Sequence, residues 1–289
     1  MKIGNLTIEQ LSEGLFEIGR DGSIHKLNNR HLKRGRLRES GKLGIPNNPP
    51  VGIDPVLILK DDMKILLDTG LGIGLDNRGH SNSISNIRTN LEIFGLGPED
   101  ITHVVLSHLH YDHVAGITFN DGDLKTQPTL PNALCFVQKR EWEYALSQVN
   151  RRDSQFGVTY ELDELYRLVA DERFVFIDQD FFRLAEGIDL IWTGGHTPGH
   201  QIVRLTSDDD VAYFLGDLVP NDLLLNTGAT PLDEDTARTR QMKLTWLRRA
   251  WEEDAELLFY HSIYQKSGKL AKDKYRNYIL QDNTRIKES

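Results

Sequence analysis

The 289-residue sequence has a single cysteine, Cys135, so no disulfide bond can form within the chain. It also has no stretch of about 18 apolar residues, the length that a membrane-spanning helix needs. Basic residues are fewer than acidic ones, 34 against 43, and the net charge of −9 argues against general affinity for nucleic acid. We therefore expect a cytoplasmic protein that binds neither nucleic acid nor membranes.

Hydrophobic patterning predicts an α/β protein, and no linker interrupts the pattern, so a single domain is expected over residues 1–289. A hairpin is expected around the turn pair Asp61-Asp62. The spacing of apolar residues predicts four helices, over residues 84–95, 139–150, 161–170 and 235–251. A further, polar helix is expected to end the chain. Strands pair first, helices then intervene, and the scheme repeats in the second half. This order favours an αββα four-layer sandwich, in which two central sheets lie between helices.

A basic segment at about 20–50 interrupts the otherwise mixed charge pattern. Between Lys26 and Lys42, seven Lys and Arg residues are accompanied by one acidic residue, Glu39. Such a segment is either a solvated loop or a lid near an active site, because long loops in compact domains often carry function. Its positive charge would suit an anionic or polar group of a substrate.

The most informative stretch follows an apolar strand and contains His108, His110, Asp112 and His113. Three imidazoles and a carboxylate are costly to bury unless something pairs with them, and a divalent metal ion is such a partner. Side chains two residues apart on an extended turn point to the same side, so His108 and His110 are expected to hold one ion. Asp112 and His113 are adjacent, point differently, and suit a second ion.

Three further candidate ligands, His196, Asp217 and His261, stand just beyond the ends of later apolar strands. This repeated placement predicts one shared site. His196 would join the first ion and His261 the second, while Asp217 could place one oxygen on each. Zn²⁺ accepts this mixture of imidazole and carboxylate ligands.

The order and rough spacing of these residues resemble the metallo-β-lactamase superfamily over about residues 55–265. The resemblance rests on four features, which are H-x-H-x-D-H at 108–113, H-T-P-G-H at 196–200, the Gly-Asp pair ending in Asp217, and the strand-end His261. Asp68, which follows an earlier strand, matches the superfamily's first motif. The run H-x-H-x-D-H is highly specific.

This resemblance implies a binuclear hydrolase in which a hydroxide bridging two divalent metal ions is the nucleophile. It implies that Asp112 is both a ligand and the group that carries a proton to the leaving group. Asp68 would support a metal-bound histidine by hydrogen bonding, without touching an ion. His200 is expected to hold the H-T-P-G-H loop. Zn²⁺ is the expected metal, with Mn, Fe and Co as alternatives.

Within the superfamily, the chain most resembles the N-acyl homoserine lactone lactonases. The predicted function is hydrolysis of an ester or lactone carbonyl in a small molecule, with a quorum-quenching lactonase as its specific form. Asp217 argues against a true β-lactamase, since those enzymes lack a bridging aspartate. The alternatives are a glyoxalase II-like thioesterase, a phosphodiesterase and a non-catalytic binding protein. The oligomeric state is open, with a homodimer among the options.

One position departs from the lactonase pattern. Many of those lactonases carry a substrate-binding tyrosine three residues beyond the bridging aspartate, and here that position is Pro220. Tyr111, Asn221 and Tyr264 are the expected substrate contacts in its place.

Overall fold

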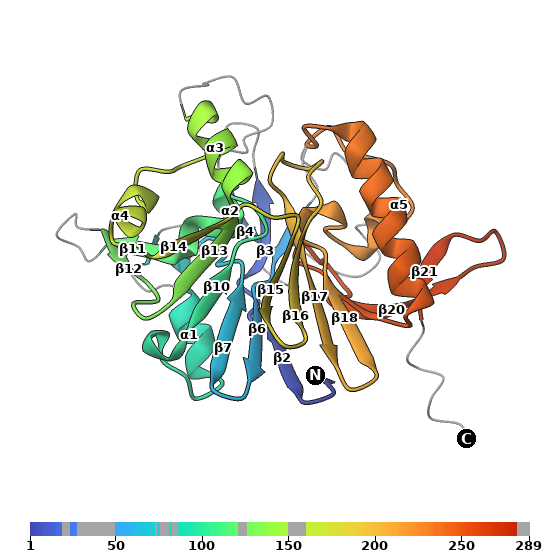
Figure 1. Ribbon diagram of the computed structural model, residues 1–289, viewed down its shortest axis with the longest axis horizontal. Helices are drawn as coiled ribbons and strands as arrows, with labels where there is room; N and C mark the ends of the chain where they lie inside the picture. The colour runs from blue at the N-terminus through green and yellow to red at the C-terminus, as the bar shows by residue number, and fades with distance from the viewer. Residues whose placement is uncertain are drawn as a thin grey trace.

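The computed structural model describes residues 1–18, 24–27, 50–72, 74–75, 81–82, 86–120, 126–149 and 160–281. Two seven-stranded sheets face each other, and helices cover their outer sides (Figure 1). The predicted αββα sandwich is confirmed. The basic segment predicted at about 20–50 lies outside the described residues, apart from β4 (Ile24–Leu27) and Pro50.

The first sheet is antiparallel at its N-terminal edge and parallel beyond its fourth strand. In order across the sheet, its strands are β1 (Lys2–Ile3), β2 (Leu6–Gln10), β6 (Val56–Lys60), β7 (Met63–Leu67), β10 (His103–Val105), β13 (Leu134–Gln138) and β14 (Phe174–Ile177). The hairpin β6–β7 turns at Asp61-Asp62 as predicted, with Asp61 in the left-handed region at φ 49°. Aspartate tolerates that conformation better than most side chains do.

The second sheet is antiparallel except where β18 runs parallel to β19. Its strands are β15 (Phe181–Ala185), β16 (Ile188–Trp192), β17 (Gln201–Ser207), β18 (Asp210–Phe214), β19 (Glu256–Leu258), β20 (Ser267–Lys272) and β21 (Tyr278–Leu280).

The prediction of a helix at the C-terminal end of the chain is wrong, because β20 and β21 form a hairpin there. The Asp273 carboxylate accepts hydrogen bonds from the backbone N–H groups of Tyr275 and Asn277, which closes the turn. Leu270 and Leu280 then pack with the second sheet's outer core. Polar composition favoured a helix, but local side-chain bonds and pairing with the sheet determine the structure.

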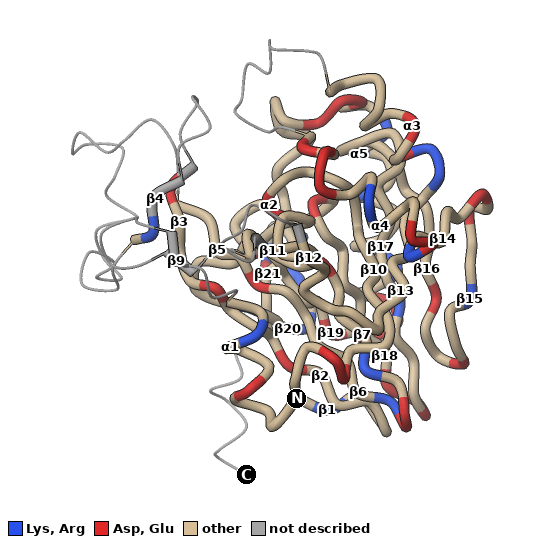
Figure 2. The backbone as a smooth tube through the Cα atoms, turned by 90° about the vertical axis from the view of Figure 1, so that its left-hand side faces the viewer, with Lys and Arg blue, Asp and Glu red and all other residues tan. Residues whose placement is uncertain are grey.

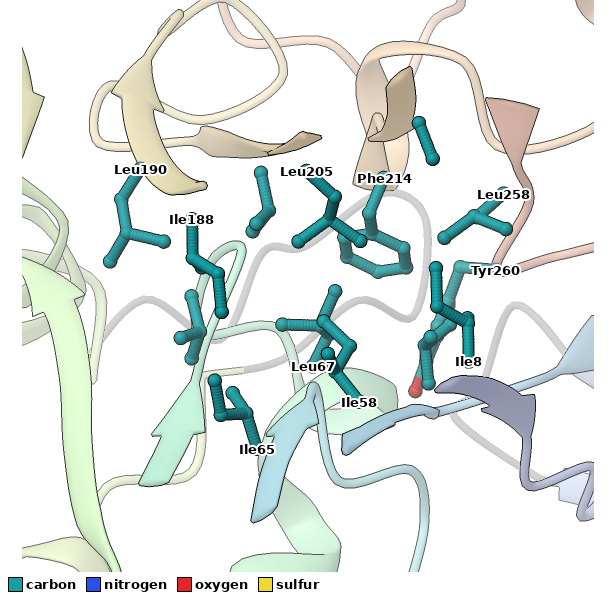
Figure 3. Packing of buried hydrophobic residues seen from close by; sticks show 14 of the residues in the cluster. Ile8, Ile58, Ile65, Leu67, Ile188, Leu190, Leu205, Phe214, Leu258 and Tyr260 are labelled. Atoms are coloured by element: carbon teal, nitrogen blue, oxygen red, sulfur yellow. The ribbon is translucent and has the colours of Figure 1, made fainter. Parts of the chain in front are cut away.

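The main core lies between the sheets, where side chains from both meet (Figure 3). Ile65 and Leu67 of β7 point into this core, whereas Leu66 between them belongs to the core under the outer helices. This alternation follows from the two-residue period of a strand. From the second sheet, Leu205 and Phe214 meet them, and all five side chains are fully buried.

Helices complete the outer layers (Figure 1). The first sheet is covered by α1 (Asn86–Glu92), α3 (Lys139–Gln148) and α4 (Leu165–Ala170), and the second by α5 (Thr236–Glu252). The first turn of α5 is stabilised because the Asp235 side chain accepts a hydrogen bond from the N–H of Arg238 at 2.9 Å. Within the described ranges, no helix combines the length and apolar character needed to span a membrane.

Shorter elements occupy the connections. A small sheet consists of β3 (Gly14–Ile18), β4 and β5 (Val51–Ile53), and two-stranded ribbons pair β8 (Gly74–Leu75) with β9 (Ser81–Asn82) and β11 (Thr118–Asn120) with β12 (Thr126–Pro128). The short helices are α2 (Tyr111–Val114), η2 (Pro98–Asp100), η3 (Ala115–Ile117), η4 (Gly216–Leu218) and η5 (Asp222–Leu224). Figure 2 shows acidic and basic residues interspersed along the described backbone.

Candidate metal centre

The predicted site residues meet at one edge of the sandwich, beyond the C-terminal ends of strands from both sheets. The 107–113 segment follows β10 of the first sheet. In the second sheet, His196 follows β16, Asp217 follows β18 and His261 follows β19. Strand ends of the two facing sheets therefore bring residues far apart in the sequence to one place.

A first cluster consists of His108, His110 and His196, all of which are buried. The Nε2 atom of His108 lies 2.9 Å from Nδ1 of His110, and that atom lies 3.2 Å from Nε2 of His196. One nitrogen of each ring thus points to a common centre. This trio is the one that the sequence predicted for a single ion.

A second cluster consists of Asp112, His113 and His261. The Nε2 atoms of the two histidines are 3.2 Å apart. An Asp112 carboxylate oxygen lies 3.5 Å from Nε2 of His261 and 3.9 Å from Nε2 of His113. The structure therefore also brings together the predicted second trio.

Asp217 lies between the two clusters and faces each with a different oxygen. Its Oδ1 atom is 3.4 Å from Nε2 of His113 and 3.3 Å from Nε2 of His261. Its Oδ2 atom is 3.3 Å from Nε2 of His196. Oδ1 is buried and accepts no conventional hydrogen bond from the residues that the structure describes. A carboxylate in this position has the geometry to share one oxygen with each of two cations.

The charge distribution fits cations at this centre. Burial and the neighbouring imidazoles lower the pKa of His108 and His110 well below the usual range, so both rings are neutral and able to bind a metal. Burial would raise the pKa of Asp217, but the surrounding histidines hold it well below its usual range. Burial likewise would lower the pKa of His113 and His261, but the carboxylates of Asp217 and Asp112 raise it. A divalent cation would neutralise the same carboxylate charge in place of those protons.

Protein groups hold the remaining ring nitrogen of four of the five histidines, which is the support that ligating histidines require. Asp68 bonds Nδ1 of His113 at 2.8 Å and also accepts the N–H and hydroxyl of Ser107, both at 2.7 Å. A supporting role for Asp68 needs this contact with His113, and the role itself stays a prediction.

Sequence reasoning missed three of the supporting groups. Asp233 bonds Nδ1 of His196 at 3.0 Å, and the carbonyl of Gly52 bonds Nδ1 of His261 at 2.8 Å. The Ser107 hydroxyl lies 3.0 Å from Nδ1 of His108. Asp233 and Gly52 follow no fixed spacing from their histidines. Ser107 could have been found from its position directly beside the first ligand.

His200 lies beside the clusters, and protein groups engage both of its ring nitrogens. Nδ1 is 2.8 Å from the Thr193 hydroxyl, and Nε2 accepts the backbone N–H of Asp217 at 3.1 Å. The ring therefore connects its own loop to the segment that carries Asp217. This geometry agrees with a structural role for His200.

The residues predicted to contact substrate lie in different settings. Asn221 borders the second cluster, because its Nδ2 atom donates to the carbonyl of His261 at 3.5 Å. Its Oδ1 atom and the Tyr264 hydroxyl are both buried without a hydrogen-bond partner in the described part of the chain. Tyr111 is half-buried against the inter-sheet core. The carbonyl of Pro220 accepts a hydrogen bond from the backbone N–H of His261 at 2.9 Å, so Pro220 connects its own loop to the segment that carries His261.

The family model described as the metallo-beta-lactamase superfamily matches residues 48–262, about three quarters of the chain. The chain belongs to the metallo-beta-lactamase superfamily. The match spans both sheets and includes all seven residues of the two clusters and Asp217.

Curated relatives of this superfamily member include N-acyl homoserine lactonases. AttM of Azorhizobium caulinodans is 29% identical over 165 residues, which are 50% of this chain and 57% of the relative. AttM of Rhizobium johnstonii is 29% identical over 55% of this chain and 64% of the relative. The chain thus spans somewhat more than half the length of these relatives.

Solved structures share the fold over nearly the whole chain. A probable metal-dependent hydrolase from Staphylococcus aureus superposes with a TM-score of 0.74 at 24% identity, covering 98% of this chain and 99% of the other. AidC, described as a dizinc quorum-quenching lactonase in complex with a product, gives the same TM-score at 20% identity, with coverages of 98% and 96%.

Proposed function

We propose that this protein is a metal-dependent hydrolase that opens the ester bond of a lactone. The observation that carries the proposal is Asp217, whose two oxygens face two separate histidine clusters. The N-acyl homoserine lactonases among the relatives support an N-acyl homoserine lactone as the substrate, and so a quorum-quenching role. A simple carboxylic ester has the same reacting group.

The proposed cofactor is a pair of divalent ions, with Zn²⁺ first because imidazole and carboxylate ligands suit it. The first cluster would hold one ion, the second cluster the other, and Asp217 would bridge them. Ions in such a site supply Lewis acidity, which polarises an ester carbonyl and makes water a better nucleophile at neutral pH.

Asp112 is the proposed proton carrier. Its side chain is 17% exposed, so it can reach both the clusters and a bound substrate. Its backbone carbonyl accepts a hydrogen bond from the Tyr260 hydroxyl at 2.6 Å, which holds the segment that carries Asp112 in place. The carboxylate would take a proton from water and deliver it to the leaving alkoxide when the ester bond breaks.

Substrate orientation is assigned to Asn221, Tyr264 and Tyr111 in place of a tyrosine at position 220. A buried polar atom without a partner is costly, and both the Asn221 amide oxygen and the Tyr264 hydroxyl are in that state. A polar substrate group beside Asn221 would remove that cost. The amide oxygen would accept an N–H of the substrate, and the tyrosine hydroxyl would donate to a carbonyl.

The test is a substrate panel assayed on zinc-loaded protein, with metal content measured on the same sample. The panel contains an N-acyl homoserine lactone, an aryl ester, a glutathione thioester and a phosphodiester. We expect close to two zinc ions per chain and fastest turnover of the lactone. Asp217→Asn should abolish turnover, whereas Asp178→Asn, at an exposed position, should not change it. Preferential turnover of the thioester or the phosphodiester would contradict the proposed lactone substrate. Metal binding without turnover of any substrate in the panel would contradict the proposed hydrolase function.

A further inference from the structure

A buried glutamate outside the two clusters connects the loops that carry the first of them. Glu141 lies on α3 and is 0% exposed. Burial raises the pKa of its carboxyl, and all of its hydrogen-bond partners in the described part of the chain are neutral. A carboxylate in such a place must be well satisfied by hydrogen bonds to be tolerated.

Four donors converge on this carboxylate, two on each oxygen. Oε1 accepts the backbone N–H of Leu109 at 3.0 Å and the hydroxyl of Tyr160 at 3.3 Å. Oε2 accepts the hydroxyl of Thr197 at 2.6 Å and the backbone N–H of Gly199 at 3.0 Å. Two donors on each oxygen leave little acceptor capacity unused.

Two of these donors are chain neighbours of the first cluster. Leu109 stands between His108 and His110, and Thr197 directly follows His196. The ring of Tyr160 also packs edge-on against His110, with centroids 5.1 Å apart. One carboxylate therefore links a loop from the first sheet to a loop from the second, next to all three histidines.

The loop that carries His196 approaches α3 closely enough to restrict the sequence at a second position. A Cβ atom on Gly199 would lie 2.3 Å from both the Cβ and the backbone nitrogen of Glu141. Only a glycine permits this contact, which places its N–H on the carboxylate. The second cluster has separate supports, since Asp68 holds His113 and the Gly52 carbonyl holds His261.

We propose that Glu141 is the positioning residue of the first cluster, fixing the distance between His110 and His196 so that both bind one ion. The inference rests on the proposed metal site and assigns to Glu141 no contact with substrate or metal. It predicts that loss of the carboxylate weakens one of the two metal sites and leaves the other unchanged.

The test compares Glu141→Gln with the wild-type chain. Glutamine keeps the side-chain length but presents an NH₂ group to two of the four donors, so two hydrogen bonds are lost. Zn²⁺ affinities are measured by competition with a chromophoric chelator, and the Co²⁺-substituted protein gives an absorption spectrum for each site. We expect one site to weaken about 10- to 100-fold, the usual effect of removing such support, and the other to stay within about twofold.

Glu143→Gln is the matched control. Glu143 stands two positions further along the same helix, on its solvent-facing side; its side chain is 62% exposed and pairs loosely with Lys139 at 4.0 Å. The substitution removes the same charge from the same helix, so both Zn²⁺ affinities should equal those of the wild type.

A second variant covers the case in which Glu141→Gln fails to fold. Thr197→Val keeps the glutamate and removes the shortest of its four bonds, and it should weaken the same site by a smaller factor. Equal weakening of both sites, or no weakening in a folded variant, would overturn the role of Glu141. Wild-type protein that binds two ions but hydrolyses no ester would overturn only the proposed function.

Discussion

Replacing Glu13 with glutamine should remove a pH-dependent loss of stability from the folded protein. Glu13 lies between β2 and β3 and is 3% exposed. Its carboxylate accepts the backbone N–H of Leu71 at 2.8 Å and that of Gly72 at 3.3 Å, in the loop that follows Asp68. Burial raises the pKa of Glu13 to about 7, although these two hydrogen bonds and the charge of Lys26 act in the opposite direction.

The sign and size of the effect follow from the two states. In the unfolded chain the carboxyl has its ordinary pKa of 4.5, so it loses its proton at a lower pH than in the folded protein. The free energy of unfolding therefore falls as the pH rises from about 4.5 through about 7. The pKa difference corresponds to about 3 kcal/mol once both states are ionised, and about 2.5 kcal/mol of this develops between about pH 5 and pH 8.

The assay is urea unfolding of wild type and Glu13→Gln at about pH 5 and about pH 8, with equal metal loading. Glutamine loses one of the two N–H bonds at every pH, so the variant can be less stable at pH 5. Relative to that of the wild type, however, the free energy of unfolding of the variant should rise by about 2 to 3 kcal/mol between pH 5 and pH 8. The control Glu92→Gln removes a charge at an exposed position of α1 and should show no such gain. A stability difference between Glu13→Gln and wild type that is the same at both pH values would refute the reasoning.

Three further predictions concern the metal centre and the loop beneath it. Asp112→Asn should lower kcat about 100-fold or more with little change in KM, because it removes proton transfer; steady-state kinetics showing a raised KM with unchanged kcat would contradict this. Asp233→Asn should weaken binding of one ion about 10- to 100-fold, since Asp233 orients His196, and chelator competition that detects no change would exclude that role. Gly116→Ala should lower the Tm, because the added Cβ would lie 2.0 Å from the carbonyl oxygen of Thr69; overpacking of this kind costs about 1–3 kcal/mol, and an unchanged thermal unfolding curve would rule out the clash.

The residues of the two clusters could be predicted from the sequence because each follows an apolar strand or belongs to a dense motif. Their supports could not. In helix 139–150 the apolar pattern places Trp142, Ala145 and Leu146 on one face, and patterning assumes that a charged neighbour faces water. In the structure Ala145 and Glu141 are the buried pair, and Leu146 is 43% exposed. Trp142 also packs against the core under the outer helices. Glu141 is buried because four donors outside the helix stabilise its carboxylate, and no local rule contains those donors.

The distribution of the clusters over both sheets has a consequence for how the molecule stays folded. Nε2 of His113 and Nε2 of His261 are 3.2 Å apart in space and 148 residues apart in sequence. An ion held between them would act as a reversible cross-link closing a loop of that length, and a covalent link of that span restricts the unfolded chain by about 5 kcal/mol. Metal removal would then lift this restraint on the unfolded chain and lower the free energy of unfolding, while the core between the sheets remains. Occupancy of the site would thereby set how stable the fold is as well as whether the site can act.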